Sequence, residues 1–235
     1  HGLPQRSASL ITSLNFIAEQ FAPRQFGCVV FLWNSDLSLP QLPRGCEIIY
    51  ASGAVMDFAR LIPDHMLSLA DYVWLMTDNV VLNSGAHAVN LRELAMLANT
   101  NCLDILSPSL TPQGSSNAIM WSNASTSPGR MVNFIELRSA LLTVPALQMV
   151  AQLAGANITG CWGYDALLYG ALKKWTGRRP RIGVADSMIM RGGEIAGSQS
   201  VKGMHHSWCA KTMTTSAPIA KKTAGAEMLA FWRDR

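Results

Sequence analysis

The segment from Tyr72 to Leu82 constrains the fold more than any other part of the chain. It is almost entirely apolar and short enough for a buried strand, but Asp78 and Asn79 interrupt it before a second apolar stretch begins. We therefore expect a strand with an acidic-amide pair at its carboxyl end. Ligands bind at the carboxyl ends of strands in open α/β sheets, and the oxygens of this pair suit a divalent cation or ribose hydroxyls. An ordinary Asp-Asn turn is the alternative interpretation.

The composition indicates a globular domain with a large core. The 235 residues are 49% apolar and 14% charged, and no linker-like stretch interrupts them, so we expect a single domain over residues 1–235. The net charge of +4 is mild, and the basic clusters have no interleaved aromatic residues. They therefore predict no nucleic-acid partner, but they can attract an anion such as a nucleoside diphosphate. No apolar run is long enough for a membrane span.

The five cysteines are widely spaced and include no Cys-x-x-Cys pair. This spacing argues against a zinc ribbon or a disulfide framework, and it predicts buried free thiols in a reducing compartment such as the cytoplasm. The Golgi lumen stays open as an alternative, because the chain begins at His1 and an anchor could have been removed. The glycosylation sequons at Asn123 and Asn157 would matter only in a secreted protein.

Apolar runs and amphipathic stretches alternate along the chain and predict a mixed α/β order. Strands are expected at residues 27–33, 46–50, 103–106, 131–137 and 181–185, besides the one that begins at Tyr72. Helices are expected at residues 10–21, 55–69 (kinked or divided at Pro63), 87–98, 143–153, 164–175 and 224–233. The stretch 111–130 predicts a loop or an irregular hairpin, and 190–223 predicts a loop able to close over a site. This order favours one three-layer core.

A second polar motif, Trp162-Gly-Tyr-Asp165, stands at the start of the predicted helix 164–175. A carboxylate at a helix N-terminus is stabilised by the free amides and the macrodipole, so Asp165 can simply cap this helix. The functional alternative makes Asp165 a general base that deprotonates an acceptor hydroxyl. Trp162 would then stack on a sugar ring with Tyr164 beside it, and Gly163 would let the backbone approach the substrate.

Several motifs, in the same order, resemble a plant-rich family of uncharacterised domains grouped with GT-A glycosyltransferases. The helix with Phe58-Ala-Arg60 and the strand that leads to Asp78 are similar to the family's Phe-Ala-Lys/Arg helix and its Tyr-Asp-Tyr-Ile strand, which ends in an acidic triplet. Trp162-Gly-Tyr-Asp165 resembles its Trp-Gly-x-Asp motif, and Gly183-Val-Ala-Asp186-Ser187 resembles its Gly-Val-Val-Asp-Ser segment. The resemblance covers most of residues 25–197.

The resemblance implies a GT-A-like α/β fold, in which a mixed central sheet is flanked by helices. Residues 25–110 would form a Rossmann-like nucleotide-sugar half, and residues 111–235 the acceptor half. The implied activity is a hexosyl- or pentosyltransferase that moves a sugar, with inversion, from a UDP- or GDP-type donor to a hydroxyl of a glycan or glycoconjugate. The expected donor-binding residues are Leu32, Trp33, Asn34, Ser52, Arg60, Asp78 and Asn79. The expected acceptor-side residues are Trp162, Gly163 and Tyr164, with Asp165 as the catalytic base.

The chain departs from the family at the expected metal site. Of the family's acidic triplet only the middle position, Asp78, is an acid here, and the histidine that follows the Asp-Ser segment is missing. A manganese or magnesium ion would be held by Asp78 and Asn79, with His206 as a substitute ligand, and the lost carboxylates weaken such a site. Arg191 or Lys202 could supply positive charge to the leaving diphosphate instead.

Two other functional classes stay open. The eroded acidic triplet is also compatible with a catalytically inactive nucleotide- or sugar-binding domain. A hydrolase built from Cys209 with His205 or His206 is the weaker alternative, because the chain has no Gly-x-Ser-x-Gly elbow and nothing places Cys209 at a helix start. Kinase and dinucleotide-binding functions lack their glycine-rich loops.

Overall fold

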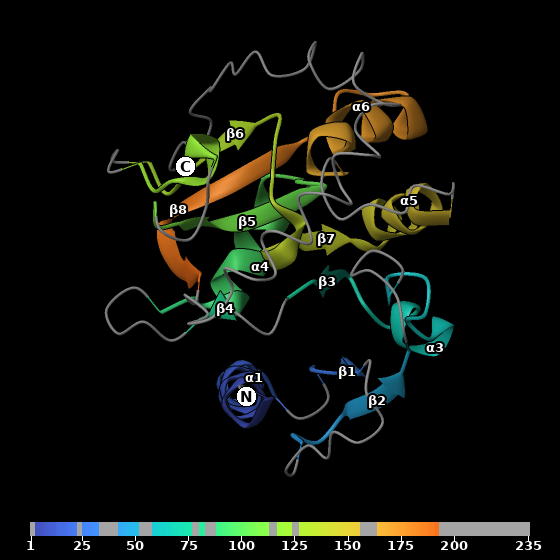
Figure 1. Cartoon of the computed structure of the whole chain (residues 1–235). Coiled ribbons are helices and arrows are strands. Elements are labelled where there is room, and N and C mark those ends of the chain that lie inside the picture. Colours follow the sequence, from blue (N-terminus) through green and yellow to red (C-terminus); the bar gives the residue numbers. More distant parts are fainter. Residues whose placement is uncertain are drawn as a thin grey trace, which may run out of the picture.

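Two β-sheets organise the chain (Figure 1). The computed structural model describes residues 3–22, 25–32, 42–51, 58–76, 80–82, 88–112, 117–123, 127–155 and 164–192. Its strands are β1 (Cys28–Leu32), β2 (Cys46–Tyr50), β3 (Tyr72–Trp74), β4 (Val80–Val81), β5 (Ile105–Leu110), β6 (Gly129–Val132), β7 (Leu141–Thr143) and β8 (Ile182–Gly192). Its helices are α1 (Leu3–Ala18), α3 (Asp64–Leu67), α4 (Leu91–Thr100), α5 (Val144–Gly155) and α6 (Tyr164–Thr176), with short 3₁₀ turns η2 (Ala118–Met120) and η3 (Leu137–Ser139). The predicted mixed α/β class is confirmed.

The larger sheet has mixed strand directions and a common carboxyl edge. Its order is β3-β7-β5-β8-β4, and β6 also pairs with β8. β7 is antiparallel to both β3 and β5, and β5 is parallel to β8. The strands β3, β5 and β8 therefore point the same way. We call the side of the sheet on which these three strands end the carboxyl edge; in α/β proteins this is the side where ligands bind.

The core of the protein surrounds the central strands β5 and β8. Their apolar side chains are buried, and Leu106 and Val184 are fully inaccessible to solvent. α4 packs on β5, α5 packs on β7 and β3, and α6 packs on α5. Helices thus flank the sheet, as predicted. No helix in the described ranges is long and apolar enough to cross a membrane.

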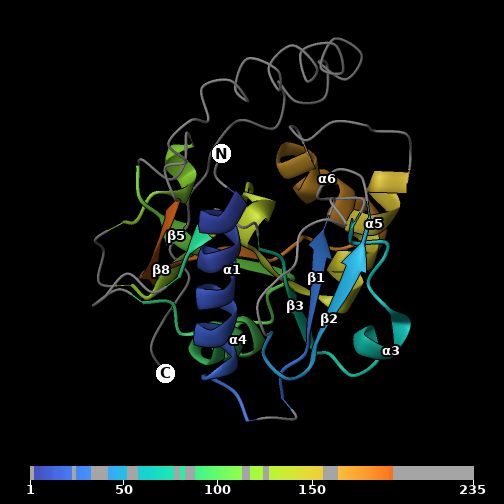
Figure 2. The same cartoon turned by 60° about the horizontal axis from the view of Figure 1, so that its bottom comes forward.

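Helix α1 and the β1–β2 pair lie together on one side of the large sheet (Figures 1 and 2). Ile17 of α1 belongs to the main core, whereas Leu14, Val30 and Leu32 form a second, smaller cluster. α1 is also held by Gln20, whose side chain accepts a hydrogen bond from Leu91 N (2.7 Å) and donates one to the carbonyl of residue 89 (3.0 Å). These contacts fix the segment that leads into α4.

β1 and β2 form a parallel pair that a disulfide closes at its first register position. Cys28 and Cys46 are Cα partners in this pairing, their Cα atoms lie 4.3 Å apart, and their sulfur atoms are bonded. Gly45, which precedes β2, has a φ of 85°, a backbone conformation that glycine adopts without strain. The prediction of buried free thiols is wrong for these two cysteines, because parallel pairing brings residues distant in sequence side by side. Cys102 is free but exposed. The Cys28–Cys46 disulfide by itself does not assign the protein to a cellular compartment.

Removing this disulfide is expected to destabilise the protein measurably. The bond joins residues 18 positions apart, and a loop of this size corresponds to about 3 kcal/mol through the restricted unfolded chain. The Cys28→Ser/Cys46→Ser variant should therefore have a free energy of unfolding lower by about that amount in non-reducing urea titrations. Cys102→Ser is the matched control and should change little. Equal stability of wild type and the double variant would show that the crosslink contributes nothing.

The predicted elements that depend on local sequence agree with the structure. β2 has the predicted bounds, β1 lies within residues 27–33, and α6 ends one residue beyond its predicted end. Thr143 caps α5 as predicted, since its hydroxyl accepts a hydrogen bond from Ala146 N (3.4 Å). Pro63 precedes α3 and divides the predicted helix 55–69. α1 begins before residue 10, and α4 begins after its cap Asn90 rather than at residue 87.

Four strand predictions are wrong in their extent. The strand that begins at Tyr72 is expected to carry Asp78 and Asn79 at its carboxyl end, but β3 ends at Trp74, four residues before Asp78. β5 continues through Pro108 to Leu110, because β7 pairs only with its first two residues and β8 changes register beside the proline. β8 continues past Asp186 to Gly192, with an irregular stretch at that point. The predicted strand 131–137 is β6, which begins at Gly129 and ends at Val132. β7 was not predicted at all, and η2 lies in the predicted loop 111–130.

Candidate functional site

Three chain segments that carry predicted donor-binding residues start from neighbouring positions. Leu32 ends β1, and its carbonyl accepts a hydrogen bond from Ala51 N (2.9 Å) at the end of β2. Met76, which follows β3, packs against the small cluster that contains Leu32. The chain therefore continues from these three places into Trp33, into Ser52 and toward Asp78. Leu32 itself is buried (6% exposed), so its side chain packs beneath this region rather than facing solvent.

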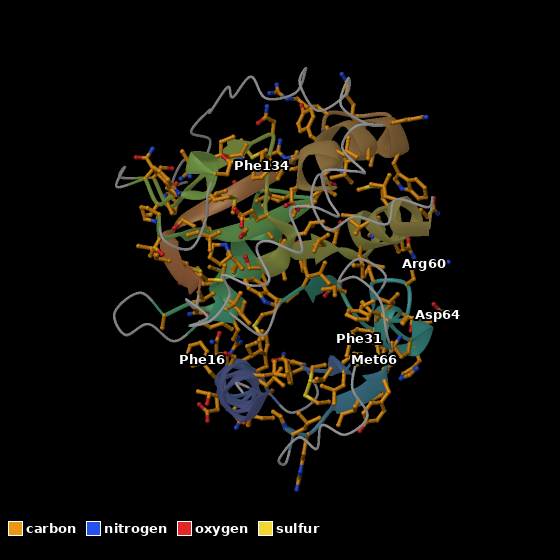
Figure 3. All side chains as sticks on the ribbon, in the orientation of Figure 1. Phe16, Phe31, Arg60, Asp64, Met66 and Phe134 are labelled. Atoms are coloured by element: carbon orange, nitrogen blue, oxygen red, sulfur yellow. A yellow bond between two sulfur atoms is a disulfide. The ribbon has the colours of Figure 1, made fainter. Side chains whose placement is uncertain are left out.

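Arg60 belongs to a short segment that packs against β1. Its neighbour Phe58 stacks on Phe31 of β1, with ring centroids 4.8 Å apart, so this segment packs on the β1–β2 pair. The Arg60 side chain is exposed, and in Figure 3 it lies at the periphery beside α3. Its role in donor binding stays a prediction.

Most of the remaining predicted site residues lie outside the described residues, and their placement stays a prediction. They are Trp33, Asn34, Ser52, Asp78, Asn79, Trp162, Gly163 and His206, and the same holds for Cys209, His205 and Lys202. Tyr164 is the first residue of α6. In the described ranges no group of three or more His, Cys, Asp or Glu side chains is arranged to hold a metal ion; the predicted ligands Asp78, Asn79 and His206 are not part of those ranges.

Asp165 connects the start of α6 to the turn η3. It stands in the first turn of α6, as predicted, and it is partly buried. Its Oδ1 accepts a hydrogen bond from Leu137 N at 3.0 Å, which is the first amide of η3. The carboxylate therefore holds a neighbouring turn, and this contact was not predicted from the sequence because the two residues are 28 positions apart.

The same turn η3 reaches the end of β3. After η3, the carbonyl of Ala140 accepts a hydrogen bond from Leu75 N (2.8 Å), one residue beyond β3. From Leu137 to Ala140 the chain makes a single tight turn, so the Asp165 carboxylate lies on the order of 10 Å from Leu75. The predicted acceptor side and the predicted donor side of the site are thus linked through one short turn.

A buried ion pair that the sequence did not reveal organises the loop after β5. Arg130 of β6 and Asp186 of β8 pair through Nη1 and Oδ1, and their side chains are only 4% and 2% exposed. From the sequence, Asp186 is recognisable only as part of the Gly183-Val-Ala-Asp186-Ser187 motif at the expected end of a strand. Arg130 is a single charge within an otherwise apolar strand, which is the signal that could have marked it as a buried partner.

The phenol of Tyr72, at the start of β3, has a raised pKa. Burial lifts its pKa above the ordinary value of about 10, and the charges of Asp71 and Cys102 add to the effect. The folded state therefore holds this proton more tightly than the unfolded chain does.

The raised pKa predicts a loss of stability at high pH. The contribution of the protonated Tyr72 phenol to the unfolding free energy is fully present below pH of about 10. It is lost as the pH rises through the pKa of Tyr72 in the folded state. Tyr72→Phe should therefore flatten the decline of the unfolding free energy between pH of about 9 and 12. Urea unfolding of both proteins at several pH values measures this, and parallel declines would contradict it.

Comparisons with known proteins do not assign the chain to a family. No protein-family model matches it, and a search of curated proteins finds no significant match.

Proposed function

We propose that the ends of β1, β2 and β3 form a nucleotide-binding site. The observation that carries this proposal is the convergence of Leu32, Ala51 and Met76, from which three polar chain segments continue. In α/β proteins, nucleotides bind outside the carboxyl ends of strands. Among nucleotide-binding α/β proteins, the order of the motifs that contain Arg60, Asp78, Asp165 and Asp186 favours glycosyltransferases. We propose that the chain is a GT-A-like glycosyltransferase domain that uses a nucleoside-diphosphate sugar.

The donor would be held by residues that follow these strand ends. Trp33, Asn34 and Ser52 would contact the base and the ribose, and Asp78 with Asn79 would bind ribose hydroxyls. Arg60, whose segment packs on β1 through Phe58, would lie near the donor phosphates. A divalent cation, when bound, would neutralise charge on the donor diphosphate. Asp78 and Asn79, with His206, are its expected ligands.

Asp165 would act on the acceptor side. Its carboxylate would take the proton of an acceptor hydroxyl, whose oxygen attacks the anomeric carbon while the bond to the nucleoside diphosphate breaks on the opposite face. One carboxylate beside the acceptor is sufficient for this inverting displacement. The hydrogen bond from Leu137 N orients the carboxylate, and the link through η3 places it near the end of β3.

Nucleotide-dependent stabilisation tests the donor site. Wild-type protein is heated with UDP, GDP and their sugar conjugates, with and without manganese, and with a chelator. A ligand at about 100 times its dissociation constant adds about 2.7 kcal/mol to the unfolding free energy. Asp78→Ala should abolish this stabilisation and leave the unliganded protein intact. Asp71→Ala, at the opposite end of β3, is the matched control and should retain it.

Three results separate the alternatives. Unchanged nucleotide binding by Asp78→Ala would place the donor site elsewhere. Nucleotide binding without turnover of any donor would identify an inactive binding domain. Loss of activity on thiol alkylation, without any nucleotide effect, would favour the hydrolase instead.

A further inference from the structure

The loop of residues 117–123, here called the Trp121 loop, is fixed along its whole length. Asn117 caps η2 by accepting a hydrogen bond from Ile119 N (3.0 Å). Arg130 Nη2 donates to the carbonyls of Ile119 (2.5 Å) and Trp121 (2.6 Å). Asp186 Oδ1 accepts from Asn123 N (2.8 Å). The loop is therefore held by the same buried ion pair that joins β6 to β8.

Two further contacts tie the loop to β5. Trp121 forms an isolated bridge with Leu110, the last residue of β5, and Ser122 N donates to the Leu110 carbonyl (3.3 Å). Met120 is completely buried and anchors the loop in the main core. The backbone at residue 121 is thus attached to the end of β5, at the carboxyl edge of the large sheet.

The ion pair that holds this loop is costly. Arg130 Nε and Asp186 Oδ2 are buried and have no hydrogen-bond partner among the residues that the structure describes. Moving two charged side chains from water into the protein interior costs desolvation free energy, which apolar side chains of similar size do not require. Such groups in a folded protein call for an explanation. Apart from their bond to each other, the two side chains hydrogen-bond to the backbone of the Trp121 loop. The cost of burying the pair is explained if the function of the protein requires a fixed geometry of this loop.

The large apolar residue that this fixed loop leaves exposed is Trp121, whose relative exposure is 38%. An aromatic ring on a fixed backbone offers a large contact area and loses little conformational entropy when it binds a ligand. Indole faces pack well against flat, partly apolar surfaces such as sugar rings. Its position at the carboxyl edge places it on the side of the sheet where the donor site is proposed.

We propose that Trp121 is a stacking platform for a sugar ring of the acceptor glycan. The proposal rests on the proposed glycosyltransferase function and names a residue for its acceptor side. The buried Arg130–Asp186 pair is a positioning device: it holds the loop so that the indole keeps one orientation. The ligand class is therefore carbohydrate, bound through a ring face, with the nucleotide bound separately.

Carbohydrate binding by Trp121→Ala tests this proposal. Calorimetric titrations with short cello-, xylo- and galacto-oligosaccharides first identify an oligosaccharide that binds wild type, in the presence of UDP or GDP. We expect Trp121→Ala to bind it about tenfold or more weakly, since a stacked aromatic contact is worth about one decade of affinity. Trp121→Phe keeps a ring face and should retain most of the affinity. Trp175→Ala is the matched control, because Trp175 is also exposed (47%) but lies near the end of α6.

The nucleotide affinity of each variant distinguishes this proposal from the proposed function. Unchanged nucleotide affinity with weakened oligosaccharide binding in Trp121→Ala alone supports the platform. Equal oligosaccharide affinity of wild type and Trp121→Ala overturns it, and so does equal weakening by Trp175→Ala. Failure of every oligosaccharide to bind wild type also overturns it, while nucleotide binding in the same experiment would leave the donor site standing.

Discussion

Replacing Arg130 by methionine is expected to lower the free energy of unfolding by about 3–5 kcal/mol, because it leaves a buried carboxylate without its partner. Asp186 would keep only the hydrogen bond from Asn123 N, and the carbonyls of Ile119 and Trp121 would lose their donor. Urea unfolding monitored by circular dichroism measures the loss.

Two companion variants make this prediction specific. Arg178→Met breaks the Arg178–Asp104 pair, in which the arginine side chain is 52% exposed. Asp104 is 8% exposed but keeps the hydrogen bond from Arg181 N (2.9 Å), so the cost should be smaller, on the order of 1 kcal/mol. Replacing both members of the buried pair, as Arg130→Met/Asp186→Leu, should restore part of the lost stability. Equal losses in Arg130→Met and Arg178→Met would show that burial of the Arg130–Asp186 pair has no energetic consequence.

Replacing Asp165 by asparagine is expected to lower turnover by roughly a hundredfold or more while the protein stays folded. The amide oxygen can still accept the hydrogen bond from Leu137 N, so the stability loss should be at most about 1 kcal/mol. An amide cannot take the proton of an acceptor hydroxyl. Nucleotide affinity should stay near that of wild type, because the proposed base faces the acceptor.

The measurements for Asp165→Asn are turnover, nucleotide affinity and thermal stability of the same preparation. Asp64→Asn is the matched control: Asp64 also stands in the first turn of a helix, but it is exposed and belongs to α3. Near-normal turnover by Asp165→Asn would remove the catalytic role. A large stability loss with unchanged turnover per folded molecule would leave Asp165 only the structural contact to η3.

Local chemistry explains which parts of the fold the sequence predicts. β2 (Cys46–Tyr50) is rich in apolar and β-branched residues and follows a glycine turn, and these local features predict its bounds. The start of α5 follows from Thr143 and the proline after it. In each case the signal lies within a few residues of the element it defines.

Pairings between distant segments decide the features that sequence reasoning missed. Local sequence predicts that the strand ends before Pro108. β5 continues through this proline because β8 pairs with this part of the strand and β7 does not. Cys28 and Cys46 show no motif spacing, and only the parallel register of β1 and β2 brings them together. The same limit applies to Arg130 and Asp186, which are 56 positions apart.

The sequence predicts only part of the candidate site, because the rest depends on contacts between distant segments. That polar residues follow strand ends is visible in the sequence, whereas the proximity of Leu32, Ala51 and Met76 depends on packing between β1, β2 and β3. Leu32 illustrates the difference: its place near the end of a buried strand is predicted from the sequence, but the hydrogen bond from Ala51 N to its carbonyl is not. Asp165 was singled out from its motif, yet its contact with Leu137 needs the folded chain.

Photoaffinity labelling tests the proposed donor site most directly. The protein is irradiated with an azido-derivatised UDP- or GDP-sugar, whichever stabilises it, and the labelled peptides are identified by mass spectrometry. The label should be prevented by excess unmodified nucleotide and should lie in peptides that span residues 33–41, 52–57 or 77–79, next to Leu32, Ala51 and Met76. Competable labelling confined to other peptides, or labelling that excess nucleotide does not reduce, would contradict a donor site at the ends of β1, β2 and β3.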